Sequence, residues 1–196
     1  VGNGWVELEQ SGAVVKVNGQ ALYFHDTSDR LNRPLVRHDF PQVSNGVLRW
    51  DFDFNWQRTG SEGTYRVFMQ LGEAAQMNDD DQDAGVGVSL LWSAIGGIHE
   101  TLGYRSGSGD TGLAQISGLT RIAVIADVTS QSFEVQINDV PVGTGLPFHN
   151  AVSLDTVRFY TDNVAEQNFA IRTFDTVVLA GGPPPPPNDP PTADDQ

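Results

Sequence analysis

Three aspartates at alternate positions of one acidic segment form the clearest metal-binding pattern in the chain. Asp79, Asp81 and Asp83 would offer hard oxygen ligands, which suit Ca²⁺ better than a transition metal. The segment is no EF-hand, because Ala84 and Leu90 stand where that motif needs Gly and Glu. The residues therefore predict a calcium loop of another kind, and a solvated acidic loop explains them equally well.

A second pair of carboxylates, Asp51 and Asp53, has the spacing that places both on one side of a strand. A retaining glycosidase needs two carboxyl groups about 5–5.5 Å apart. Two aspartates lack the reach that Glu supplies, and ion pairs with Arg49 and Arg66 explain them as readily. We therefore do not expect a glycosidase.

A polysaccharide lyase needs a cation to neutralise a uronate carboxylate and a Tyr or His to take the C5 proton. Residues of these types are present: Arg49, Arg66, Arg105, His38, His99, Tyr65 and Tyr104. The four histidines show no spacing typical of zinc hydrolases, and no Gly-x-Ser-x-Gly motif is found. Lyase chemistry therefore remains an alternative.

The composition narrows the class of ligand. The chain has 196 residues, 25 acidic against 11 basic, and a net charge of −14, which argues against nucleic acid and anionic membranes. No apolar run reaches the roughly 20 residues of a spanning helix, so no membrane insertion is expected. The absence of cysteine excludes disulfides and thiol chemistry. The basic residues are ten arginines and Lys16. A guanidinium can form two parallel hydrogen bonds with a carboxylate or sulfate group, which a lysine ammonium does not.

Period-two alternation of Val, Ile, Phe, Tyr and Trp predicts that almost all regular structure is β-strand. The expected strands are 21–25, 35–40, 46–57, 64–72, 86–93, 98–106, 121–128, 132–138, 153–160 and 169–179. Residues 73–77 fit a single turn. Ten or more strands in one domain predict an all-β fold, a two-sheet antiparallel β-sandwich of jelly-roll type.

The strand over residues 46–57 has an apolar side with Trp50 and Trp56 and a charged side with Arg49. We expect it to lie beside strands 64–72 and 86–93 in one sheet, packed on one side and open on the other. Such an open polar sheet is where β-sandwich sugar binders usually hold their ligand. The tryptophans, including Trp92, are expected in the core. The predicted ligand-binding residues are Arg49, Asp51, Asp53, Asn55, Arg66, Phe68, Gln70, Tyr104 and Arg105, with Tyr160 and Trp5 as further aromatic candidates.

At this point the chain resembles the concanavalin A-like (laminin-G-like) jelly-roll domains of bacterial carbohydrate-active proteins. The likeness lies in the pattern and order of four segments: Gly46–Phe54, Gly85–Leu90, Leu154–Tyr160 and Phe174–Leu179. It implies a first strand, Trp5–Gln10, paired beside the last one. It also implies a ligand that is a polysaccharide, a glycan or, less often, a protein.

The resemblance implies a second calcium site that clamps the two ends of the domain, with Glu7 or Glu9 facing Asp175. Comparison with the jelly-roll alginate lyases argues against lyase activity. The Arg-, Gln-x-His- and Tyr-x-Lys-containing strand motifs of jelly-roll alginate lyases are absent, and Lys16 alone cannot complete them.

Residues 1–180 are expected to form the sandwich, and 181–196 a proline-rich spacer toward a following repeat domain. The spacer and the residues after it are similar to the lead-in of cadherin-like or immunoglobulin-like repeats. The sequence therefore predicts a non-catalytic carbohydrate-binding module of a secreted or surface multidomain bacterial protein, stabilised by Ca²⁺. Its partners would be a polysaccharide, including an anionic one, or a cell-surface glycan, together with neighbouring domains of the chain. A polysaccharide lyase and an adhesin or structural module remain alternatives.

Overall fold

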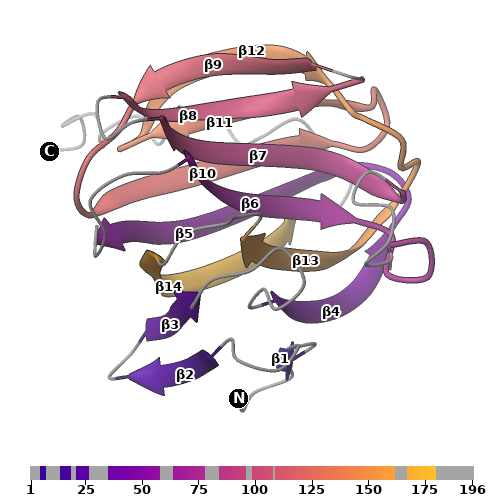
Figure 1. Ribbon diagram of the computed structural model, residues 1–196. Helices are drawn as coiled ribbons and strands as arrows, with labels where there is room; N and C mark the ends of the chain where they lie inside the picture. Colours follow the sequence, from indigo (N-terminus) through magenta and orange to yellow (C-terminus); the bar gives the residue numbers. More distant parts are fainter. Residues whose placement is uncertain are drawn as a thin grey trace, which may run out of the picture.

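The computed structural model describes residues 5–7, 14–18, 21–26, 35–57, 64–77, 84–95, 99–107, 109–161 and 167–179. These residues form fourteen strands and no helix, so none of them forms a helix able to cross a bilayer. Two seven-stranded sheets face each other, and all pairings between the described strands are antiparallel (Figure 1). The predicted two-sheet antiparallel β-sandwich of jelly-roll type is confirmed.

Sheet A has the strand order β1-β4-β13-β6-β7-β8-β9. Its strands are β1 (Trp5–Glu7), β4 (Leu35–Val43), β13 (Leu154–Thr161), β6 (Thr64–Gly72), β7 (Val86–Ile95), β8 (His99–Ser106) and β9 (Gly109–Gln115). Sheet B has the order β12-β11-β10-β5-β14-β3-β2. Its strands are β12 (Val140–Pro147), β11 (Ser132–Ile137), β10 (Thr120–Asp127), β5 (Val47–Gln57), β14 (Gln167–Leu179), β3 (Ala21–Asp26) and β2 (Val14–Asn18).

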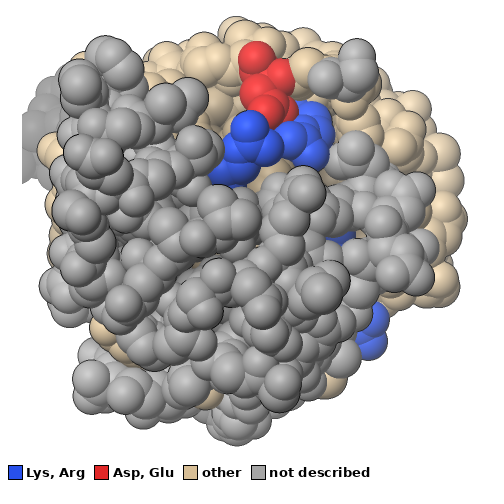
Figure 2. Space-filling view, viewed as in Figure 1, with Lys and Arg blue, Asp and Glu red and all other residues tan. Residues whose placement is uncertain are grey.

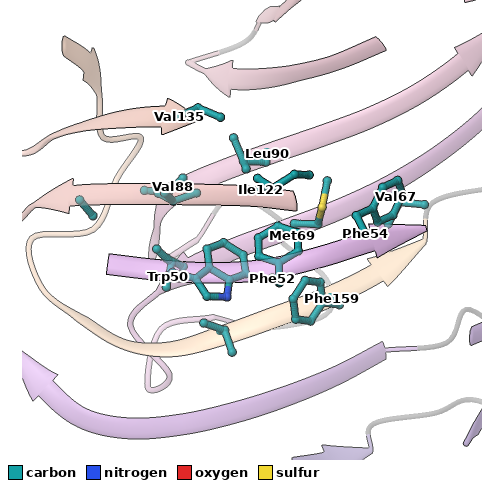
Figure 3. Packing of buried hydrophobic residues seen from close by; sticks show 14 of the residues in the cluster. Trp50, Phe52, Phe54, Val67, Met69, Val88, Leu90, Ile122, Val135 and Phe159 are labelled. Carbon is teal, nitrogen blue, oxygen red and sulfur yellow. The ribbon is translucent and has the colours of Figure 1, made fainter. Parts of the chain in front are cut away.

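The core lies between the sheets and is built from the apolar side of each central strand. Trp50, Phe52 and Phe54 of β5 point from sheet B toward Met69 and Phe159 of sheet A, and all are at most 1 % exposed (Figure 3). The rings pack at an angle to one another, with Trp50 and Phe159 centroids 5.5 Å apart. The prediction that Trp50 and Trp92 belong to the core is confirmed, whereas the side chain of Trp56 lies outside what the structure describes.

Two expectations about strand neighbours are wrong. Strand β5 is not in one sheet with β6 and β7, because it pairs with β10 and β14 on the opposite side of the core. Alternation shows which side of a strand is apolar, but an apolar side can face the core from either sheet. Strand β1 pairs with β4 rather than beside the last strand, β14, whose neighbours are β3 and β5.

Three strands lie where none was expected: β2, β9 and β12. The last two are edge strands, with glycine in both and two prolines in β12, and most of their residues are exposed or half-buried. An edge strand needs no apolar side and tolerates proline. The glycines and prolines of these two segments are typical of turns, so the sequence does not predict strands there. The single turn expected at 73–77 is present, with Gln76 N and Met77 N each donating to Glu73 O at 3.0 Å.

Candidate functional site

The outward side of sheet A carries two parallel rows of side chains that run across the strands. The polar row follows the pairings of β13 with β4 and β6, of β6 with β7 and of β8 with β9. It consists of Arg37, Arg158, Gln70, Ser89, Arg105 and Asp110. The apolar row beside it consists of Leu35, Tyr160, Phe68 and Leu91, and it ends at Gly103, which is opposite Leu91 on β8. On this side of sheet A, polar side chains thus lie next to the aromatic rings of Phe68 and Tyr160.

The centre of the polar row is a hydrogen-bonded network around Gln70. Arg158 donates from Nε and Nη2 to Gln70 Oε1, at 3.1 and 2.6 Å. The amide nitrogen of Gln70 donates to Ser89 Oγ at 3.1 Å and to the hydroxyl of Tyr160 at 3.4 Å. Because the amide accepts on one side and donates on the other, it fixes the orientation of Arg158 and Tyr160 together.

The apolar row contains a stacked aromatic pair with a guanidinium on each ring. Phe68 and Tyr160 are parallel to within 5°, with centroids 4.7 Å apart. Arg105 lies over the Phe68 ring and Arg158 over the Tyr160 ring, each with its Cζ 5.0 Å from the centroid. Cation–π contacts of this kind hold a guanidinium in place without using its N–H donors.

The centre of this face is not open to solvent, contrary to the open sheet expected from the sequence. Gln70, Ser89 and Phe68 are fully buried, and Tyr160 and Arg158 are at most 3 % exposed. Accessibility increases toward both ends of the polar row: the side chains of Arg105 and Asp110 are 17 % and 36 % exposed, and those of Arg37 and Asp39 are 26 % and 47 % exposed. Figure 2 looks onto this face and shows basic and acidic side chains meeting over its upper part, where Figure 1 places β8 and β9.

The outward side of sheet B carries a separate charged cluster. Asp51 accepts two hydrogen bonds from Arg49, from Nε at 2.7 Å and from Nη2 at 2.9 Å, and Arg121 approaches it to 3.3 Å. Asp139 lies 3.9 Å from Arg49. The hydrogen bond with Asp51 raises the pKa of the Arg49 guanidinium, against the opposing effect of partial burial.

Arginines on both faces are matched by aspartates. Arg105 donates to Asp110 from Nε at 2.8 Å and from Nη2 at 3.3 Å. Arg37 Nε lies 3.1 Å from Asp39 Oδ1, close enough for an ion pair but without the alignment of a hydrogen bond. Of the arginines whose side chains the structure describes, Arg37, Arg49, Arg105 and Arg121 thus lie beside aspartates.

The nine predicted ligand-binding residues are divided between three places. Arg49, Asp51, Asp53 and Asn55 lie on the outward side of sheet B, and Arg66, Phe68, Gln70 and Arg105 on the outward side of sheet A. Tyr104 was expected off the core, and this is wrong. Its ring packs against the core and meets the edge of Phe133 at 5.9 Å. Trp5 also packs against the core, 6.0 Å from Phe159.

Comparisons with known proteins agree with this architecture. No protein-family model matches the chain, and no curated protein matches it by sequence. Among solved structures, a sialidase matches with a TM-score of 0.69 and 13 % identity over 90 % of this chain, which spans only 17 % of the sialidase's length. The carbohydrate recognition domain of Emp47p matches at 0.59 and 14 %, covering 91 % of this chain and 90 % of its own. Alginate lyase AlyC3 matches at 0.53 and 11 %, covering 81 % and 75 %. At these identities the likeness establishes the fold.

The predicted metal ligands fall outside what the structure can place. Asp79, Asp81, Asp83 and Glu9 lie outside the described residues, and for Glu7 and Asp175 only the backbone is described. Their strands, β1 and β14, belong to different sheets. Within the described part of the chain, no three acidic or histidine side chains gather closely enough to hold a metal ion. Both calcium sites remain predictions.

Several residues of the network were missed in the sequence. Arg158 stands between Val157 and Phe159, which are both fully buried in the core, so alternation alone would have placed it outward with Tyr160. Ser89 could have been placed in the same way from β7. Asp110 follows glycine and serine residues in the sequence, which are typical of a turn, and only the hairpin register reveals that it faces Arg105.

Glu73, at the end of β6, fastens the segment that precedes β13. Its Oε1 accepts the backbone N–H groups of Val152 and Ser153 at 2.9 and 2.8 Å and the Ser153 hydroxyl at 3.1 Å, and Gln76 donates to its other oxygen. Burial by itself would raise the pKa of Glu73, but these hydrogen bonds outweigh it and lower the pKa below its ordinary value. This carboxylate is structural and holds one end of the sheet that carries the polar row.

Proposed function

We propose that this chain is a non-catalytic carbohydrate-binding module that holds a polysaccharide on the outward side of sheet A. The observation that carries the proposal is the partly exposed Arg105–Asp110 end of the polar row, where Arg105 lies over the buried ring of Phe68. Sugar recognition uses planar polar groups for hydroxyls and an apolar surface for the ring. Polar groups are accessible at the Arg105–Asp110 end of this face, and the aromatic rings lie buried beside them. The jelly-roll likeness to a carbohydrate recognition domain supports the same proposal.

Alanine substitutions on the two faces distinguish the site. Arg105→Ala and Arg66→Ala change sheet A, and Arg49→Ala, with a comparably half-buried arginine, changes only sheet B. We expect the sheet A variants to lose at least tenfold in affinity on a glycan array or in affinity electrophoresis, and Arg49→Ala to bind as the parent does. Loss in Arg49→Ala alone would move the site to sheet B. Absence of binding to any polysaccharide by the parent chain would overturn the function.

One observation favours the polysaccharide lyase as a second candidate. Tyr160 places its hydroxyl 3.4 Å from the Gln70 amide, next to Arg158, so a base-type residue and a cation meet on one face. Alginate lyase AlyC3 shares the jelly-roll fold. The binding module is nevertheless favoured, because Tyr160 and Arg158 are buried and a base must touch its substrate. A rise in the ultraviolet absorbance of unsaturated uronates, on incubation with alginate, pectin or ulvan, would decide for the lyase.

The setting of the module is part of the proposal. We place it in a secreted or surface multidomain bacterial protein, on the basis of the proline-rich stretch from residue 183 to 187 and the acidic lead-in that follows. A calcium ion bound by the acidic segment around Asp81 would rigidify it, as expected for modules that work outside the cell.

A further inference from the structure

The chain crosses from β4 of sheet A to β5 of sheet B through an asparagine followed by a glycine, Asn45 and Gly46. Asn45 is exposed and Gly46 is half-buried. Gly46 has a φ of +83°, in the left-handed region that glycine adopts most readily. This pair takes no part in the proposed function.

We infer that Asn45 is a site of spontaneous deamidation and that the hydroxyl group of Thr129 sets the rate of this reaction. The reaction consumes water and uses no cofactor, so it does not depend on whether the chain binds a sugar.

Deamidation begins when the backbone nitrogen of Gly46 attacks the Cγ atom of Asn45. A C–N bond forms and closes a succinimide ring, while the bond from Cγ to the side-chain nitrogen breaks. The leaving nitrogen takes up a proton in place of the one that Gly46 gives up, and it departs as ammonia. Water then opens the ring at either carbonyl carbon, adding its hydroxyl to the carbon and its proton to the nitrogen, and the product is aspartate or isoaspartate.

Gly46 is the type of residue that allows this attack. The nitrogen must approach the side chain of the preceding residue, and a Cβ on the attacking residue would crowd the closing ring. Glycine has no Cβ, so its backbone is the least hindered. Asn45 is exposed, and water can therefore reach the ring and open it.

In the folded chain, the turn between β10 and β11 holds both polar backbone groups of Gly46. Its N–H donates to Thr129 Oγ1 at 2.8 Å, and its carbonyl accepts from Val128 N at 2.9 Å. To attack, the nitrogen must lose its proton and turn toward Asn45, and it does neither while it donates to Thr129. A hydrogen bond of ordinary strength therefore slows the reaction by about tenfold.

Thr129 is itself positioned by the fold of sheet B. Its backbone N–H donates to Asp127 Oδ1 at 3.0 Å. Asp127 is directly opposite Val47, the residue after Gly46, in the pairing of β10 with β5. The hydroxyl group thus reaches Gly46 only when the two strands are paired, and unfolding removes it.

The test follows deamidation at Asn45 by mass spectrometry of proteolytic peptides after incubation at mildly alkaline pH. It compares the parent with Thr129→Val, which keeps the branched shape and removes the acceptor, and with Thr129→Ser, which keeps the hydroxyl group. Asn18 also precedes a glycine and serves as the internal reference. The parent in guanidinium chloride gives the rate without the folded structure, and thermal melting verifies that each variant is folded at the incubation temperature.

We expect Asn45 to deamidate at least about tenfold more slowly in the folded parent than in guanidinium chloride. Thr129→Val should raise the rate at Asn45 about tenfold and leave the rate at Asn18 unchanged, and Thr129→Ser should keep the parent's rate. Equal rates at Asn45 in the folded and the unfolded parent, or the parent's rate in Thr129→Val, would overturn the inference. So would a rise that Thr129→Ser or Asn18 shares, because the hydroxyl group would then not be its cause.

Discussion

Arg158 and Gln70 meet across neighbouring strands of sheet A, with two guanidinium N–H groups on one amide oxygen at 3.1 and 2.6 Å. Both side chains point away from the main core, yet Gln70 is fully buried and Arg158 is 3 % exposed. Two of the guanidinium's N–H groups are therefore satisfied by a neutral acceptor in a low-dielectric setting, where losing that acceptor is costly.

Gln70→Met should lower the free energy of unfolding by about 2–3 kcal/mol, because it removes an acceptor from a buried charged donor. Methionine has nearly the same length, so packing is largely kept. Gln136→Met is the matched control on sheet B, where the half-buried Gln136 donates to Glu134 at 2.6 Å. There we expect less than about 1 kcal/mol. Urea denaturation measures both, and equal losses would contradict the special role of Gln70.

Glu73→Gln should destabilise the chain in a pH-dependent way. The hydrogen bonds to the carboxylate lower the pKa of Glu73 in the folded state. Its stabilisation is therefore fully present above the ordinary pKa of about 4.3 and is lost as the pH falls through the folded pKa. We expect a loss of about 1–3 kcal/mol near neutral pH that shrinks at about pH 3, measured by urea denaturation.

Glu134→Gln serves as the control for Glu73→Gln, since Glu134 lies half-buried on the outward side of sheet B. It should change the free energy of unfolding by no more than about 0.5 kcal/mol. If Glu73→Gln costs the same at both pH values, the effect comes from the shape of the side chain and not from its charge.

The sequence predicts strand faces well and strand neighbours poorly, and β5 shows why. Trp50, Phe52 and Phe54 alternate with charged residues, and this local pattern places them in the core in any sandwich. Whether β5 lies beside β6 or across the core from it depends on pairings between distant segments, such as Arg49 with Val177 of β14. Nothing in the local alternation encodes those pairings.

The candidate site could be predicted only in part, again because alternation is local and pairing between strands is not. Alternation placed Phe68 and Gln70 outward correctly, but it could not show that both are buried there. It also could not show that Arg105 is held by Asp110, because that contact depends on the register of the β8–β9 hairpin. A residue's side of a strand is local information, and its partner is not.

Two glycines with the same backbone conformation should respond differently to alanine. Gly85 and Gly107 have φ values of +68° and +58°, a region in which alanine costs about 1 kcal/mol. A Cβ at Gly85 would lie 2.5 Å from the Cβ of Gln76, whereas one at Gly107 would meet nothing within 4 Å. We expect Gly107→Ala to cost about 1 kcal/mol and Gly85→Ala about 3 kcal/mol or more. Equal costs in thermal denaturation would contradict the close approach at Gly85.

Calcium should raise the melting temperature of the chain relative to EDTA. The acidic segment joins Met77 to Ala84, and its ends are held together, because Glu73 N donates to Gly85 O at 2.8 Å and Met77 N to Glu73 O at 3.0 Å. A loop closed in this way loses little entropy when it binds an ion. At a hundredfold excess over Kd the ion would add about 2.7 kcal/mol, or about 5–10 °C.

Three double variants locate that ion. Asp79→Asn with Asp81→Asn should abolish the calcium-dependent shift if the acidic segment binds it. Glu9→Gln with Asp175→Asn should abolish it instead if the ion clamps the two ends of the domain. Asp194→Asn with Asp195→Asn removes the same charge from the C-terminal tail and should leave the shift unchanged, which separates a bound ion from general screening of the −14 charge. No shift in the parent chain would exclude calcium as a stabilising ligand at either place.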